Sequence, residues 1–249
     1  QAQSTRYSTE ELLGQFDASA HPDFSIIPNT YTRKTNIYLR SETLAAFESM
    51  WKAAKEDGVS LEILSATRSF SAQRSIWNRK WTAPRFMGFQ EVDRAREILR
   101  YSSMPGTSRH HWGTDLDLNA LENEWFDAPP GSHVYAWLLT NGAAFGFHQV
   151  YTAKTNGRTG YEEERWHWSY LPLAEEMWEQ HCGYFTDTMM TGFKGSEWAD
   201  SLDIMQHYVH FFFIPSSLFL HPSLSLFFTS PIPLYPSISL IPSSSFFFF

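Results

Sequence analysis

Two histidines and two aspartates lie within eight residues of one another in SRHHWGTDLDL, residues 108–118. A catalytic zinc ion needs about three protein ligands and one open position for water. His110 and Asp117 are seven residues apart, and a turn at Gly113 would return the imidazole to the side of the strand that carries the carboxylate. The spacing therefore indicates two ligands of a metal site. The alternative is a polar turn that leads into a strand.

A third ligand must come from elsewhere in the chain, and His167 is the best candidate. It lies in ERWHWSYL, residues 164–171, where aromatic and polar residues alternate as in a strand. Glu164 lies three residues before His167, and a carboxylate near a metal can take the proton of the attacking water. In an ideal strand these two side chains would point to opposite faces. We therefore expect Glu164 at the entrance of the strand, with Glu163 as the alternative for its role.

The elements that position these residues can be read from hydrophobic periodicity. Helices are predicted from Ser41 to Gly58 and over residues 71–81, 132–142 and 172–181. Strands are predicted over residues 61–67, 113–121 and 164–171, with Asp115, Asp117 and Asn119 on the exposed face of a half-buried strand. Residues 1–40 are expected to be irregular and 82–107 mixed. Because helices and strands follow no regular βαβ order, the pattern favours an α+β fold.

The composition and charge of the chain argue against a nucleic-acid-binding protein and against a disulfide-stabilised one. The chain has 249 residues, a net charge of −8 and a single cysteine, Cys182. It contains no dense run of Lys or Arg, so we expect no nucleic-acid partner. It has no intrachain disulfide framework and no cysteine-based zinc knuckle. The chain begins at Gln1 without a signal segment, and we expect a processed form or a fragment.

The last forty residues differ in composition from the rest. Residues 211–249 contain no Asp, Glu, Lys or Arg and consist mainly of Phe, Ser, Pro, Leu and Ile. Prolines interrupt every apolar run well before the ~20 residues that a membrane-spanning helix needs. We interpret the segment as translated non-coding or frame-shifted sequence, and a Pro-rich hydrophobic anchor is the alternative. The expected organisation is an irregular segment 1–29, a zinc peptidase domain 30–209 and a low-complexity tail 210–249.

Three motifs, in order along the chain, resemble those of a known family. SRHHWGTDLD fits Ser-x-His-x-x-Gly-x-x-x-Asp, and residues 164–167 fit Glu-x-x-His. Upstream, residues 66–69 followed by Gln73 are similar to a Tyr-Arg-Ser segment with a downstream Gln. The chain thus resembles the D-alanyl-D-alanine carboxypeptidases of the vancomycin-resistance (VanY-like) type over residues 30–205. These zinc peptidases are related to lysostaphin and to hedgehog zinc domains, which implies a small antiparallel sheet flanked by helices.

The resemblance implies roles for the site residues. His110, Asp117 and His167 would be the zinc ligands, and Glu164 the general acid and base. The implied activity is a zinc-dependent D,D-carboxypeptidase that hydrolyses the terminal D-Ala of peptidoglycan peptides. The alternatives are a D,D-dipeptidase or wall endopeptidase of the same fold, a non-catalytic zinc module that binds wall peptides, and a metal-free protein with accidental motifs. The family also implies a bacterial cell-envelope setting, periplasmic or secreted, and we favour a monomer.

Substrate contacts are implied for three further residues. Arg68 would orient the substrate and stabilise developing negative charge, for which its planar guanidinium is suited. Ser108 and Gln73 would hold the terminal carboxylate of the substrate.

Three positions depart from the family pattern. Asp115 stands where a small residue is usual, and would be a partner of a ligand or an alternative ligand. Arg165 replaces the usual Pro. His111 is additional, and among substrate binding, ligand orientation and a surface position we favour the last.

Overall fold

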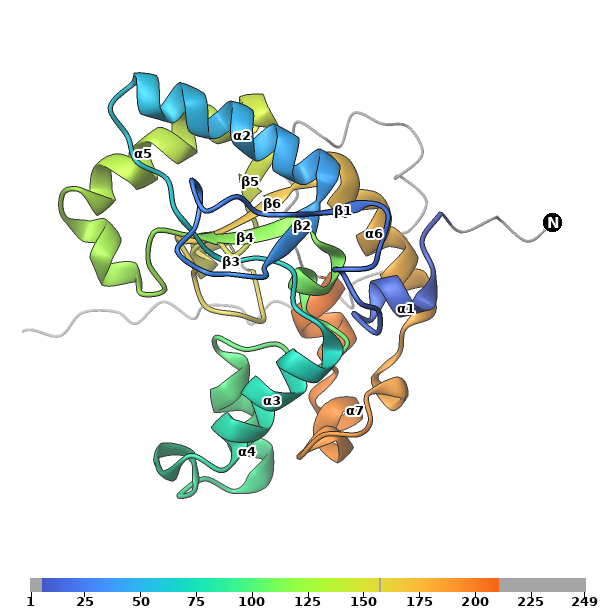
Figure 1. The fold of residues 1–249 in the computed structure, drawn as a ribbon. Coiled ribbons are helices and arrows are strands. Elements are labelled where there is room, and N and C mark those ends of the chain that lie inside the picture. The colour runs from blue at the N-terminus through green and yellow to red at the C-terminus, as the bar shows by residue number, and fades with distance from the viewer. Residues whose placement is uncertain (1–5, 157, 211–249) are drawn as a thin grey trace, which may run out of the picture. The chain divides into compact units, whose positions relative to one another are not determined.

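A four-stranded antiparallel sheet lies at the centre of the computed structural model, which describes residues 6–156 and 158–210 (Figure 1). Its strands, in the order β3-β4-β6-β5, are β3 (Ile63–Ser65), β4 (Asp115–Leu118), β6 (His167–Tyr170) and β5 (Phe147–Gln149). In the central pair, Asp117 lies opposite His167 and Asp115 opposite Ser169. Two motifs that are fifty residues apart in the chain therefore become neighbours through this pairing.

Helices surround this sheet, and a separate antiparallel pair of strands, β1 (Phe24–Ile26) and β2 (Tyr38–Arg40), precedes it. The helices are α1 (Thr9–Leu12), α2 (Ser41–Glu56), α3 (Phe70–Trp81), α4 (Glu91–Leu99), α5 (Gly131–Asn141), α6 (Leu171–Tyr184) and α7 (Ala199–Leu202). The α+β class and the small antiparallel sheet flanked by helices are confirmed. The four predicted helices are also present as α2, α3, α5 and α6.

One hydrophobic core lies between the sheet and the helices α2 and α5 (Figure 1). Phe47 of α2 and Leu138 of α5 are fully buried there, together with Leu116 and Trp168 of the central strands. Burying side chains of this size contributes about 1.5–3 kcal/mol each. This core fixes the apolar face of β4 and β6, so the opposite face of these strands is left for the polar motif residues.

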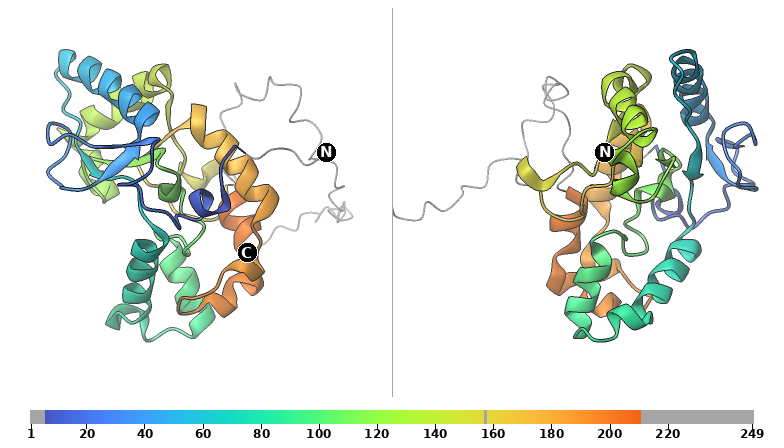
Figure 2. Two further views of the ribbon diagram at one scale, coloured as in Figure 1. Left: turned by 45° about the vertical axis from the view of Figure 1, so that its right-hand side comes forward. Right: turned by 90° about the vertical axis from the view of Figure 1, so that its left-hand side faces the viewer.

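A second core is formed mainly by α3, α4, the start of α6 and residues 185–209, and α3, α4 and α7 lie at the other end of the molecule from α2 and α5 (Figure 2). Trp77 is fully buried in it, and its indole Nε1 donates a hydrogen bond to the Lys194 carbonyl at 2.7 Å. Ile98 and Leu99 of α4 are buried against the same cluster. This packing anchors α3, whose other face reaches the candidate site.

The structure differs from the sequence-based expectations at several places. The segment 1–40, expected to be irregular, contains α1, β1 and β2, and α4 was not predicted. The prediction that 113–121 is a half-buried strand is wrong, because all four residues of β4 are buried. On its polar face, Asp115 pairs with Arg109 and Asp117 lies next to His167. No helix among the described residues has the length and apolarity needed to cross a membrane. The interpretation of residues 211–249 lies outside the described residues.

Candidate metal centre

A short turn places His110 beside Asp117. Residues Arg109–Trp112 form a single 3-10 turn, which ends at Gly113 with a left-handed backbone (φ 74°). A Cβ atom at Gly113 would lie 2.3 Å from a ring carbon of Phe24, so no other residue fits without a rearrangement. Beyond this turn the chain enters β4, and the His110 Nε2 atom lies 3.3 Å from Asp117 Oδ2.

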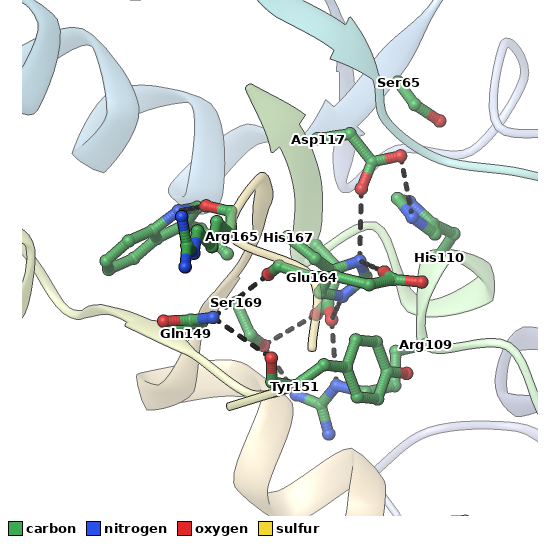
Figure 3. A network of polar contacts seen from close by, with 12 residues as sticks. Ser65, Arg109, His110, Asp117, Gln149, Tyr151, Glu164, Arg165, His167 and Ser169 are labelled. Atoms are coloured by element: carbon green, nitrogen blue, oxygen red, sulfur yellow. Dashed lines mark hydrogen bonds and ion pairs between the residues drawn. The ribbon is translucent and has the colours of Figure 1, made fainter. Parts of the chain in front are cut away.

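His167 completes the cluster from the neighbouring strand (Figure 3). Its Nδ1 atom lies 3.1 Å from Asp117 Oδ1, and all three side chains are buried. One ligand atom of each of the three residues lies within 4.8 Å of the others. The structure thus brings together the three residues that the sequence pattern singled out.

The outer nitrogen of each imidazole has its own partner. His110 Nδ1 lies 2.9 Å from the Ala66 carbonyl, and His167 Nε2 lies 2.8 Å from Asp115 Oδ2. These contacts fix the rings so that His110 Nε2 and His167 Nδ1 face Asp117. Two imidazoles and one carboxylate, with their outer nitrogens held by a carbonyl and a carboxylate, form a donor set that suits zinc.

Asp115 is completely enclosed. It is 0% exposed. Its Oδ1 accepts hydrogen bonds from the hydroxyls of Thr114 (2.8 Å) and Ser169 (2.7 Å). Its Oδ2 accepts from Arg109 Nε at 2.8 Å and faces His167. Burial would raise the pKa of Asp115, but Arg109 and His167 outweigh it and hold the pKa well below its usual range. Its contacts favour a partner of a ligand over an alternative ligand.

Glu164 lies at the entrance of β6, as expected, where the backbone turns before His167. The residue is only 8% exposed, and its Oε2 lies 3.7 Å from His167 Nδ1. Burial raises the pKa of Glu164 to about 7, against the opposing effect of the His167 charge. The side chain of Glu163, by contrast, lies 3.4 Å from the Arg165 guanidinium. Glu164 therefore has the position and the proton affinity of a general base.

Arg68 lies next to the cluster. Its guanidinium donates to Gln73 Oε1 at 2.8 Å and to Ser65 Oγ at 2.9 Å, and lies 3.9 Å from Asp117 Oδ2. Gln73 also donates to the Ser103 carbonyl at 2.7 Å and is 1% exposed, so both ends of its amide are used within the protein. Ser108 lines the cavity described below.

The preferred expectation for His111 is wrong, because this residue does not lie on the surface. It is 0% exposed and connects two segments of backbone. Its Nδ1 lies 2.6 Å from the Arg68 carbonyl, and its Nε2 accepts a hydrogen bond from the Gly106 N–H at 3.1 Å. Since the Arg68 carbonyl comes from a distant part of the chain, the pattern around His111 contained no sign of this contact. The residue holds the backbone that carries Arg68.

The cluster opens into a cavity of about 430 Å³. Arg68, Ser108, Glu164 and the three residues of the cluster contribute to its walls. Further walls come from residues that sequence reasoning missed, among them Ile76, Lys80, Tyr101, Ser102, Tyr151 and Trp166. Ile76 and Lys80 are three and seven residues after Gln73 on a predicted helix, so helical spacing would have found them.

Comparisons of the chain with known proteins agree on one family. The family model described as VanY, D-alanyl-D-alanine carboxypeptidase, matches residues 36–173. A D-alanyl-D-alanine carboxypeptidase of Enterococcus faecalis (strain ATCC 700802 / V583) is 30% identical over 136 residues. That match covers 55% of this chain and 49% of the relative, so the chain matches about half the length of the curated relative.

Two solved structures are among the matches. VanYB in complex with D-alanine-D-alanine has 24% sequence identity and a TM-score of 0.50, over 67% of this chain and 87% of that chain. The vancomycin resistance D,D-pentapeptidase VanY from a VanB-type cassette, a mutant in complex with Zn(II), has 25% identity and a TM-score of 0.48. That second match covers 63% of this chain and 88% of the other.

Proposed function

The chain belongs to the VanY family of D-alanyl-D-alanine carboxypeptidases, and from this premise we propose that it is a zinc-dependent D,D-carboxypeptidase. Its substrate would be a peptidoglycan peptide that ends in D-Ala. The observation that carries the proposal is the position of Glu164. A buried carboxylate with a raised pKa lies beside a cluster of two histidines and one aspartate, at the wall of a cavity. A purely structural metal site has no need of such a group.

His110, Asp117 and His167 would hold the metal in this proposal. When bound, zinc would polarise the scissile carbonyl and lower the pKa of a water molecule toward ~7. Glu164 would accept the proton of the attacking water and return it to the amine of the leaving D-amino acid. Burial raises the pKa of this carboxyl, which favours its acceptance of a proton.

Arg68 would stabilise the negative charge that develops on the carbonyl oxygen. Its guanidinium is held in place by Gln73 and Ser65, so little reorganisation is needed when a substrate binds. Ser108, which lines the cavity, and Gln73, which also contacts Arg68, would hold the terminal carboxylate of the substrate. Because such peptides lie outside the cytoplasm, we propose that the enzyme acts in the cell envelope.

The experiment uses the full chain and a wall-type pentapeptide that ends in D-Ala-D-Ala. Zinc content and the release of D-alanine are measured for the wild type, for Glu164→Ala and for Glu163→Ala. We expect one zinc per chain in all three proteins and loss of D-alanine release in Glu164→Ala alone. Glu163 is the matched control, because it is the adjacent acid and pairs with Arg165.

Other outcomes select among the alternatives. Zinc without D-alanine release, but with release of a dipeptide or of an internal fragment, would indicate a dipeptidase or a wall endopeptidase. Zinc with binding but no cleavage of any wall fragment would indicate a non-catalytic module. A protein that binds no zinc would contradict the proposal.

A further inference from the structure

The turn that carries Glu164 differs from the family pattern at its second residue. Residues 164–167 form a tight turn, closed by a hydrogen bond from the His167 N–H to the Glu164 carbonyl at 3.3 Å. Arg165 occupies the second position of this turn, where Pro is favoured because its ring fixes φ. An arginine leaves this dihedral angle free, so other contacts are needed to keep Glu164 in a fixed position.

Asn123 supplies such contacts from a separate loop. Its Oδ1 accepts a hydrogen bond from the Arg165 N–H at 3.0 Å, and its Nδ2 donates to the Glu163 carbonyl at 2.8 Å. The two bonded groups belong to the peptide units on either side of Glu164. One side-chain amide therefore bridges the backbone across the proposed general base, and it uses an N–H that a proline would lack.

The backbone of Glu164 itself is held by β5 and the residues that follow this strand. Gln149 Nε2 donates to the Glu164 carbonyl at 3.2 Å (Figure 3). The Glu164 N–H donates to the Tyr151 carbonyl at 2.9 Å. These contacts restrain Glu164, whereas Asn123 restrains the residues before and after it.

The loop that carries Asn123 is in turn fixed by the side chain of Arg165. The guanidinium lies 2.6 Å from Asp127 Oδ1, and its central carbon lies 5.4 Å from the centre of the Tyr135 ring. Asp127 belongs to the same 3-10 segment as Asn123, and Tyr135 belongs to α5. A proline at position 165 could form neither contact. Asn123 also lines the cavity, so Arg165 fixes a part of the cavity wall as well.

We propose that Asn123 is a positioning residue, which holds the turn that carries Glu164 and so takes the place of the rigid proline at position 165. This inference rests on the proposed function, because the orientation of Glu164 affects the rate only if Glu164 transfers a proton. A displacement of about 1 Å at such a group can lower a rate by about 100-fold. His167 is held separately, by its pairing with Asp117 in the sheet, so zinc binding should not depend on Asn123.

The test uses the full chain and measures D-alanine release from the wall-type pentapeptide, together with zinc affinity. The proteins are the wild type, Asn123→Ala and the double variant Asn123→Ala/Arg165→Pro. We expect Asn123→Ala to lower kcat by about 30-fold, with KM and the zinc dissociation constant within about threefold of the wild type. The double variant should regain about tenfold in kcat, because the proline ring restricts the turn without Asn123. A general loss of packing would give no such recovery, because the second substitution also removes the contacts of the Arg165 side chain.

Asn119→Ala is the matched control. The Asn119 amide also makes two backbone contacts, with the Ser60 carbonyl at 2.8 Å and the Glu62 N–H at 3.3 Å, but these hold a different segment. Because Asn119 has a left-handed backbone (φ 63°), its replacement by Ala should destabilise the protein at least as much as Asn123→Ala does. We expect this control to keep kcat within about threefold of the wild type. An equal loss of kcat in the two single variants overturns the proposal.

A second measurement does not depend on activity. Hydrogen exchange of the His167 N–H, which closes the turn, is followed by NMR in the wild type, Asn123→Ala and the double variant, with zinc and with EDTA. We expect exchange about tenfold faster in Asn123→Ala, and a return toward the wild-type rate in the double variant. Asn123→Ser takes the place of Asn123→Ala if the latter does not fold.

Unchanged exchange in Asn123→Ala, or a double variant with no more activity than Asn123→Ala, overturns the proposal. A wild type that releases no D-alanine contradicts the proposed function instead. Hydrogen exchange then still decides whether Asn123 holds the turn.

Discussion

Replacing Asp115 by Asn tests whether this carboxylate tunes the metal centre through His167. The substitution removes one negative charge and keeps the shape of the side chain. The amide oxygen can occupy the position of Oδ2, where it still accepts from Arg109 and His167. The amide nitrogen would then face Thr114 and Ser169, whose hydroxyls can rotate to accept a hydrogen bond. We therefore expect the variant to fold.

The expected loss has two parts. Neutralising the partner of His167 makes its imidazole a poorer ligand, and changes of this kind weaken metal affinity by about 10- to 100-fold, or roughly 1.4–2.7 kcal/mol. Arg109 loses its ion pair with a fully buried carboxylate, which lowers the free energy of unfolding of the metal-free protein by about 3 kcal/mol. Zinc affinity is measured by competition with a chromophoric chelator, and stability by urea unfolding in the presence of EDTA.

Ser169→Ala is the control for Asp115→Asn. It removes one hydrogen bond to Asp115, at 2.7 Å, from a side chain that forms no hydrogen bond to His167. We expect its zinc affinity to stay within about threefold of the wild type. If a folded Asp115→Asn protein binds zinc as tightly as the wild type does, Asp115 does not act through His167. If Ser169→Ala weakens zinc binding as much as Asp115→Asn, the effect is one of general packing.

Two further predictions concern the framework of the site and are checked by the free energy of unfolding. Gly58→Ala should cost about 1 kcal/mol, because Gly58 has a φ of 75° but open space around it. Gly113→Ala should cost about 3 kcal/mol or more, since its Cβ would also meet Phe24, and equal losses would contradict the steric argument. Burial lowers the pKa of His181 to about 4, from a usual value of 6.5. The contribution of this histidine to the free energy of unfolding is therefore fully present above pH 6.5 and is lost as the pH falls toward 4. The loss is about 2 kcal/mol at pH 5. The difference in free energy of unfolding between the wild type and His181→Gln should shrink by this amount between about pH 7 and pH 5. Stability curves of the two proteins that run parallel over this pH range would refute the prediction.

The periodicity of the sequence was sufficient to predict most of the elements and which side chains share a face. The alternation in residues 164–171 predicted His167 in the polar cluster and Trp168 in the hydrophobic core, whereas Trp166, which precedes β6, also lines the cavity. The helix α4 was missed, although Val92, Ala95, Ile98 and Leu99 have helical spacing. The spacing of these apolar residues was therefore sufficient to predict α4.

Burial of polar groups was not predictable, because it depends on partners from distant segments. One partner of His111 is the backbone carbonyl of Arg68, more than forty residues away. Alternation in β4 indicated a solvated polar face, but that face is closed by Arg109 from the preceding turn and by residues of β6. Sequence patterns cannot distinguish a charge that faces water from one that faces a buried opposite charge.

The pairing of Asp115 with Arg109 has a consequence for the chemistry of the site. A second carboxylate close to a zinc ligand would, if it were not neutralised, lower the net positive charge of the centre and weaken its action on a carbonyl. Arg109 Nε lies 2.8 Å from Asp115 and both side chains are almost completely buried, so the two charges form a neutral unit. Asp115 can then orient His167, while in the proposed site Asp117 would be the carboxylate that offsets the charge of the metal. Asp115, which departs from the family pattern, and the buried Arg109 are therefore best understood as a pair. Each residue neutralises the buried charge of the other.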